Sequence, residues 1–177
     1  YSMANKSGKP NMDAAEHVTN SLEEVGIRVL KNESVAMQIT ESGAQVAEES
    51  PDSLYLVGLG ASWPNNVNVS QALNDVPDSA ARVVILHNPE AFEKLPANTS
   101  PVSVAGHTHG GQFNIPFTPE WSYRSLLQKD KAHSYGWMEE YGASGNKLYV
   151  NPGIGLSTLP LRINRPPEIT VFTLKKQ

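Results

Sequence analysis

Cysteine is absent from this sequence of 177 residues. Disulfide bonds and thiolate metal sites are therefore excluded, and any metal ion must be bound by His, Asp, Asn, Glu or backbone oxygen. An excess of positive charge is also absent, because 14 Lys and Arg face 18 Asp and Glu and the net charge is -4. A protein needs a basic surface to bind a nucleic-acid backbone, so we expect no nucleic acid among the partners.

Long apolar runs are missing as well. No stretch approaches the roughly 20 apolar residues that a membrane-spanning helix requires, and residues 1–11 contain no apolar signal core. The chain as given is therefore predicted to be soluble. Its 39% hydrophobic and 18% charged residues suit one globular domain that comprises residues 1–177.

The order of the predicted elements indicates an α/β fold. Residues 12–26 place apolar side chains on one stripe of an amphipathic helix, and residues 69–76 are a second, shorter helical segment. Apolar or alternating runs bounded by turn residues predict strands at residues 27–30, 34–39, 54–59, 82–87, 102–106, 148–150 and 168–174. The continuous apolar run at 82–86 is typical of a strand covered on both faces, whereas 34–39 alternates like a half-exposed strand. Layers of helix and sheet follow from this pattern.

Three histidines follow predicted strands and carry the chemistry of the sequence. His87 ends the strand at 82–87, and His107 and His109 follow the strand at 102–106, so all three can converge at one edge of a sheet. Residues two apart in an extended segment point the same way, which lets His107 and His109 reach neighbouring metal positions. The glycines that frame this segment are Gly106, Gly110 and Gly111. The alternative is that these are polar loop histidines without a ligand, and the second strand-terminal histidine and the glycine frame favour the metal site.

Three ordered motifs resemble a known family. They are "ILHNPE" at 85–90, "VAGHTHGGQ" at 104–112 and "LYVNPGIGLSTLPLRINRPPEITVFTL" at 148–174. Together they resemble the calcineurin-like metallophosphoesterases, especially the bacterial branch that includes lipid-sugar pyrophosphohydrolases and phosphodiesterases. The resemblance implies a layered αββα sandwich that holds two divalent metal ions, Mn, Zn or Fe. It also implies that His87 and His107 bind the second ion and His109 the first.

The family's other metal ligands lie in upstream motifs that this sequence lacks. It contains no Asp-x-His, no Gly-Asp and no Gly-Asn-His-Asp. We therefore expect the chain to be the C-terminal part of a longer enzyme, with the catalytic residues upstream of Tyr1 and little activity by itself. A chain of this kind is predicted to expose apolar strand edges, on residues 82–86 or 102–105, and to associate with the missing N-terminal half or with itself.

Other residues near the motifs are candidates for smaller roles. Arg162 and Arg165 could bind substrate phosphate, because a guanidinium matches phosphate oxygens, although solvated loop arginines explain them equally well. Asn88 and Glu90 could orient His87 as partners behind the metal ligands, and a turn around Pro89 is the alternative explanation.

The resemblance predicts a hydrolase that cleaves phosphoester or pyrophosphate bonds by a hydroxide activated at two metal ions. A mononuclear zinc hydrolase with three histidine ligands and a non-catalytic interaction module that retains the fold are the alternatives. The expected substrate is a phosphorylated small molecule or a lipid-linked phosphate. The location stays open between the cytoplasm and a membrane reached through an N-terminal segment.

Overall fold

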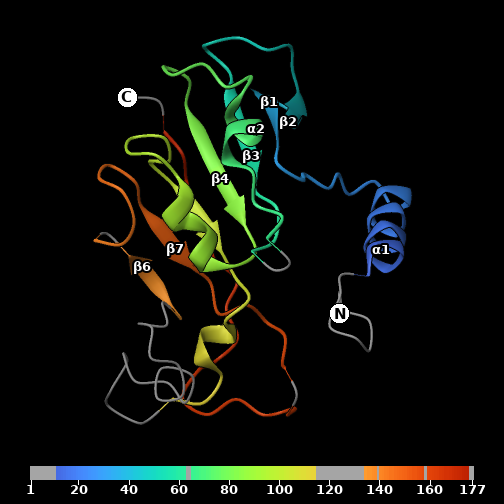
Figure 1. Ribbon diagram of the computed structural model, residues 1–177, viewed down its shortest axis with the longest axis vertical. Coiled ribbons are helices and arrows are strands. Elements are labelled where there is room, and N and C mark those ends of the chain that lie inside the picture. The colour runs from blue at the N-terminus through green and yellow to red at the C-terminus, as the bar shows by residue number, and fades with distance from the viewer. Residues whose placement is uncertain (1–10, 63–64, 115–133, 139, 158, 176–177) are drawn as a thin grey trace. The chain divides into compact units, whose positions relative to one another are not determined.

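The computed structural model describes residues 11–62, 65–114, 134–138, 140–157 and 159–175 (Figure 1). The chain forms two compact units, Tyr1–Ala81 and Arg82–Gln177. Strands and a few helices occur in both units, and unit 2 combines parallel with antiparallel strand pairs. The predicted α/β class is therefore confirmed. No helix in the described ranges has the length and hydropathy needed to cross a membrane.

The first unit is built around three antiparallel strands. β1 (Glu33–Thr40) pairs with β2 (Gly43–Val46) on one side and with β3 (Leu54–Gly58) on the other. The unit also contains α1 (Met12–Glu24) and α2 (Val69–Leu73). Its buried apolar side chains are Val35, Ala36, Tyr55, Val57, Leu59, Ala72, Val76 and Ala80.

Asn32 fixes the entry of the chain into β1. Its backbone is left-handed, with φ of 56°, and asparagine tolerates this conformation better than most residues. Its buried side chain accepts hydrogen bonds from the N–H groups of Gly60 and Asn68 and donates one to the carbonyl of Asn66. One side chain therefore ties the start of β1 to the loop between β3 and α2.

One prediction for this unit is confirmed and another is wrong. The helix predicted at residues 12–26 is confirmed as α1, but none of its residues is buried and Val18 is 44% exposed. The half-exposed alternation predicted for 34–39 is wrong, because the neighbours Val35 and Ala36 are both buried while Ile39 is 68% exposed. The predicted strands did not include β2. This strand pairs with the second half of β1 and buries none of its own residues.

The described part of the second unit contains three parallel strands and one antiparallel strand. β4 (Arg82–Leu86) pairs with β5 (Ser103–Ala105), which pairs in turn with β7 (Leu148–Val150). β6 (Gly136–Met138) adds to β7 in the opposite direction. Two 3-10 helices follow the parallel strands, η1 (Pro89–Lys94) after β4 and η2 (His109–Gly111) after β5. In Figure 1 the arrow of β4 points toward the edge where η2 lies.

The core of the second unit lies between its strands and η1. Phe92 of η1 is fully buried and stacks on Tyr141, with ring centroids 5.8 Å apart. Leu95, at the end of η1, is also buried, as are Leu148 and Val150 of β7. Burial of these side chains holds η1 on the sheet and thereby fixes the chain directly after β4.

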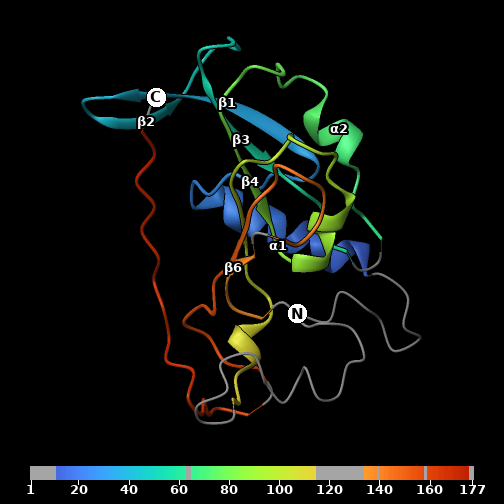
Figure 2. The same ribbon diagram turned by 90° about the vertical axis from the view of Figure 1, so that its left-hand side faces the viewer.

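Three strand predictions for the chain were wrong. Residues 27–30 and 168–174 form no strand, and β6 lies in a stretch that had been expected to be irregular. Figure 2 shows the C-terminal segment as an extended trace, and Ile169 and Val171 in it are 82% and 85% exposed. The expected apolar edge at 102–105 is also wrong, because β5 is paired on both sides.

Candidate metal centre

The candidate site lies where the parallel strands of the second unit end. His87 directly follows β4, His107 comes two residues after β5, and Asn151 directly follows β7. Backbone hydrogen bonds continue past the strands, from Gly106 N–H to the His87 carbonyl at 3.3 Å and from Asn151 N–H to the Ala105 carbonyl at 2.8 Å. Because parallel strands place their carboxyl ends at the same edge, residues distant in sequence become neighbours here.

His87 and His107 face each other through ring nitrogens. Nε2 of His87 and Nδ1 of His107 are 3.0 Å apart, and the rings meet edge to face with centroids 4.7 Å apart. Two imidazole nitrogens bound to one metal ion at about 2.0–2.1 Å lie about 2.9–3.4 Å from each other. In this structure the contact is a hydrogen bond, in which one of the two nitrogens carries the hydrogen. The same separation also fits two ligands of a single ion once that hydrogen is lost.

The surroundings of His87 favour its neutral form. Desolvation lowers the pKa of His87, and the charge of His109 lowers it further, whereas the nearby Glu90 carboxylate raises it. A neutral imidazole keeps the lone pair that a metal ion requires. Glu90 itself is exposed, and the Asn88 carbonyl accepts a hydrogen bond from Ala91 N–H at the start of η1. The roles proposed for Asn88 and Glu90 behind His87 stay predictions.

The segment around His107 and His109 is a tight turn, so the prediction of an extended segment is wrong. Both histidines have left-handed backbones, with φ of 66° and 54°, and Thr108 between them is right-handed. The Thr108 hydroxyl donates to the Ser134 carbonyl and accepts from Gly110 N–H. A left-handed conformation is strained for residues other than glycine, so the contacts around the turn must offset the strain at the two histidines.

His109 points to a different partner. Its Nδ1 lies 3.2 Å from the Gly155 carbonyl, outside the pair that His87 and His107 form. Across the described ranges, no group of three or more His, Cys, Asp or Glu is placed to hold a metal ion. The three histidines therefore do not form the single three-ligand group that a mononuclear zinc hydrolase requires.

The two arginines predicted near the substrate both contact the loops of the site. Arg162 donates hydrogen bonds to backbone carbonyls, among them that of His109 at 3.2 Å and that of Pro152 at 2.8 Å. Arg165 is only 7% exposed, and its guanidinium lies 4.0 Å from the centre of the Tyr135 ring. Desolvation lowers the pKa of Arg165, and the charges of Tyr135 and Glu168 oppose this effect. Phosphate binding by either arginine stays a prediction.

Gly110 shows how closely Arg165 packs against the histidine turn. A Cβ on Gly110 would lie 2.6 Å from Cδ of Arg165 and 2.8 Å from Cβ of Pro152. Gly110 also has φ of 62°, which a residue with a side chain rarely adopts. The glycine that follows His109 is therefore required by both its conformation and its neighbours.

Sequence reasoning missed two residues that hold the loops of the site. Gln112 donates from Nε2 to the carbonyls of Ser157 and Leu159, and its Oε1 accepts from Ser157 N–H at 2.9 Å. Glu168 accepts hydrogen bonds from Tyr149 and Thr170, and these lower its pKa. Gln112 belongs to the motif that contains the histidines, so its position was a usable signal, whereas nothing local in sequence marks Glu168.

Comparisons with known proteins give similarity over most of the chain. No family model and no solved structure matches it. It is 30% identical over 155 residues to a Bacillus subtilis protein named uncharacterized metallophosphoesterase YkuE, covering 85% of this chain and 47% of that protein. It is 27% identical over 158 residues to the Escherichia coli phosphodiesterase YaeI, covering 89% and 51%.

The name of a third relative includes that protein's substrate. The chain is 23% identical over 159 residues to the UDP-2,3-diacylglucosamine pyrophosphatase LpxG of Chlamydia trachomatis, covering 88% of this chain and 44% of that protein. The chain thus spans about half the length of the curated relatives it matches.

Proposed function

Because the chain belongs to the calcineurin-like metallophosphoesterase family, we propose that it provides part of the metal centre of an enzyme that hydrolyses phosphoester or pyrophosphate bonds. The observation that carries this proposal is the 3.0 Å approach of His87 Nε2 to His107 Nδ1 at the ends of two parallel strands. Side chains at the carboxyl ends of parallel strands are where α/β proteins bind ligands.

The residues present fit part of a dinuclear site. His87 and His107 would hold one divalent ion, Mn, Zn or Fe, and His109 would contribute a ligand to a second ion from the other side of the turn. Two divalent ions in such a site offset the charge of a phosphoryl group and activate water for attack. The remaining ligands would come from outside the described residues, since no third His, Cys, Asp or Glu joins the pair within them.

The chain's own residues keep the ligands in place. The left-handed turn directs His107 back toward His87, and Thr108 fixes this turn through the Ser134 carbonyl. Desolvation lowers the pKa of His87, which favours the neutral form that can bind a cation. Phe92 packs η1 against the sheet, which holds the backbone that follows His87. These contacts preorganise the ligand pair, so little ordering is needed when an ion binds.

A lipid-linked phosphate is the substrate class we propose. Gly155, which contacts His109, lies between Ile154 and Leu156, and these side chains are 70% and 48% exposed. Further exposed apolar side chains of the same loop are Leu159, Leu161 and Ile163. Exposed apolar side chains next to a metal site are suited to the apolar part of a substrate. The name of the relative LpxG, which specifies a diacylated sugar nucleotide, points in the same direction.

The test of the metal centre replaces one ligand at a time in the natural full-length protein. His87→Ala and His107→Ala should each lower the bound metal, measured by inductively coupled plasma mass spectrometry, and should lower phosphodiester hydrolysis by orders of magnitude. His17→Ala is the matched control, because His17 is an exposed residue of α1. Normal metal content and turnover in either variant would remove that histidine from the site. An unmodified protein with neither metal nor turnover would indicate a non-catalytic module.

A further inference from the structure

Within the described residues, Arg162 donates hydrogen bonds to an unusual set of partners, all of them backbone carbonyls. Its Nε and Nη2 donate to the Gly155 carbonyl, Nη2 also donates to the Pro152 and Gly153 carbonyls, and Nη1 donates to the His109 carbonyl. The segment 151–155 has no regular secondary structure that could satisfy these acceptors. A planar guanidinium with five N–H donors is the side chain best able to gather carbonyls from two segments.

The Gly155 carbonyl determines the hydrogen position on His109. A carbonyl oxygen only accepts hydrogen bonds, so the 3.2 Å contact requires His109 Nδ1 to carry the hydrogen. In the neutral ring the lone pair then resides on Nε2. A Cβ on Gly155 would lie 3.8 Å from Cε1 of His109, so the histidine ring also packs directly against this glycine. The place of one loop carbonyl therefore decides which nitrogen of His109 is available to a ligand.

We propose that Arg162 is a positioning residue that sets the tautomer of His109. By holding segment 152–155, it keeps the Gly155 carbonyl against His109 Nδ1, and Nε2 becomes the nitrogen that binds a cation. Phosphate would have to compete with four carbonyls for the same N–H groups, which argues against direct substrate binding by Arg162. The tautomer is a property of the chain alone, and only the use of Nε2 as a metal ligand rests on the proposed function.

The first experiment measures the tautomer in the metal-free, natural full-length protein. Long-range 1H–15N correlation spectra distinguish protonated from unprotonated ring nitrogens, and His109→Gln identifies the His109 signals. In the unmodified protein, Nδ1 should give the shift of a protonated nitrogen and Nε2 that of an unprotonated one. Arg162→Gln should abolish this difference by releasing the Gly155 carbonyl. The signals of His87 and His107 should not move, which shows that the variant is folded.

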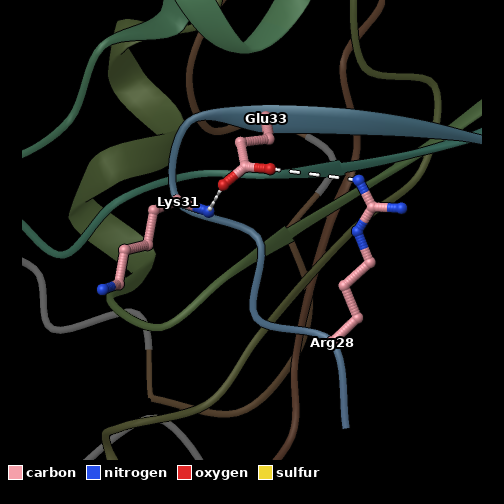
Figure 3. Close-up of polar contacts among 3 residues, drawn as sticks. All are labelled: Arg28, Lys31 and Glu33. Atoms are coloured by element: carbon pink, nitrogen blue, oxygen red, sulfur yellow. Dashed lines mark hydrogen bonds and ion pairs between the residues drawn. The ribbon is translucent and has the colours of Figure 1, made fainter. Parts of the chain in front are cut away.

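Arg28→Gln is the matched control. Arg28 is an arginine of the first unit whose side chain is 52% exposed, and its Nη2 lies 4.0 Å from Glu33 Oε2 (Figure 3). Loss of this charge should leave the His109 spectrum unchanged. Arg162→Lys keeps the charge of Arg162 but lacks the planar fork, so it should resemble Arg162→Gln. This second variant also keeps the test decisive if the glutamine variant does not fold.

The second readout is the affinity for Zn²⁺, measured by calorimetric titration. Loss of a partner that orients a metal ligand typically weakens binding 10- to 100-fold, and we expect this range for Arg162→Gln. An unaltered His109 spectrum in both Arg162 variants would overturn the proposal, as would an altered spectrum in the Arg28→Gln control. An altered His109 spectrum in a protein that binds no Zn²⁺ would retain the positioning role and refute the proposed function instead.

Discussion

Replacement of Gly110 by alanine is the sharpest test of the packing around the histidine turn. The added Cβ would lie 2.6 Å from Cδ and 2.7 Å from Cγ of Arg165, and 2.8 Å from Cβ of Pro152. Arg165 is buried and Pro152 belongs to the loop that Arg162 binds, so neither neighbour can simply turn into solvent. The turn must shift, and the two histidines beside it must shift with it.

The expected cost has two parts. A left-handed conformation costs an alanine about 1–2 kcal/mol more than a glycine, and Gly110 has φ of 62°. Crowding of a packed interior by an added carbon typically costs about 1–3 kcal/mol. Gly110→Ala should therefore lower the free energy of unfolding by about 2–5 kcal/mol in total.

Two other glycines separate the conformational cost from the cost of crowding. Gly153 has φ of 65°, but a Cβ added there would have no neighbour within 4 Å, so Gly153→Ala should show only the conformational cost of about 1–2 kcal/mol. Gly106 has neither a left-handed backbone nor a neighbour within 4 Å, so Gly106→Ala should be neutral or slightly stabilising. Urea denaturation of the three variants gives the differences from the midpoints, provided that the slopes agree. A Gly110→Ala variant as stable as Gly106→Ala would refute the reasoning.

Two further predictions concern side chains that bind neighbouring segments. Asn32→Ala removes a buried side chain that bonds to three backbone groups, and it should lower the free energy of unfolding by about 3 kcal/mol, measured by urea denaturation; an unchanged midpoint would contradict this. Glu168→Gln should destabilise the protein only above the acidic range. Hydrogen bonds from Thr170 and Tyr149 lower the pKa of Glu168, so its stabilising effect is complete above its ordinary value of 4.5 and is lost as the pH falls through the lower folded value. Melting curves between pH 2 and pH 7 should converge at the acidic end for wild type and variant, and parallel curves would refute the assignment.

The convergence of His87 and His107 could be predicted because it depends only on strand order and direction. His87 directly follows β4 and His107 comes two residues after β5, and parallel strands bring such ends to one edge. The conformation of the segment that holds His107 and His109 could not be predicted in this way. Histidine adopts positive φ more often than most residues other than glycine, but such conformations are uncommon, so the two histidines alone do not predict a left-handed turn. The contacts that stabilise this turn come from Ser134 and Arg165, both distant in sequence.

The wrong strand predictions have a different cause. Residues 168–174 alternate like a strand, but a strand forms only when a neighbour supplies partners for its backbone groups. The apolar pattern describes what a segment can do, whereas pairing depends on the rest of the fold. The roles of Arg162 and Arg165 were equally hidden, because an arginine in a loop sequence can face solvent, phosphate or backbone carbonyls with the same local pattern.

At positions 107 and 109, the residue that would best stabilise the left-handed backbone differs from the residue that the proposed metal site needs. Selection for stability alone would place glycine at both, because glycine adopts φ of 66° or 54° without the cost that histidine incurs. Substitution of both histidines by glycine should therefore yield a protein that melts at a higher temperature and has lost two side chains proposed to bind metal ions. Any evolutionary or engineering search that rewards only thermal resistance would drift toward that inert variant, and a search for better catalysts must score both properties together.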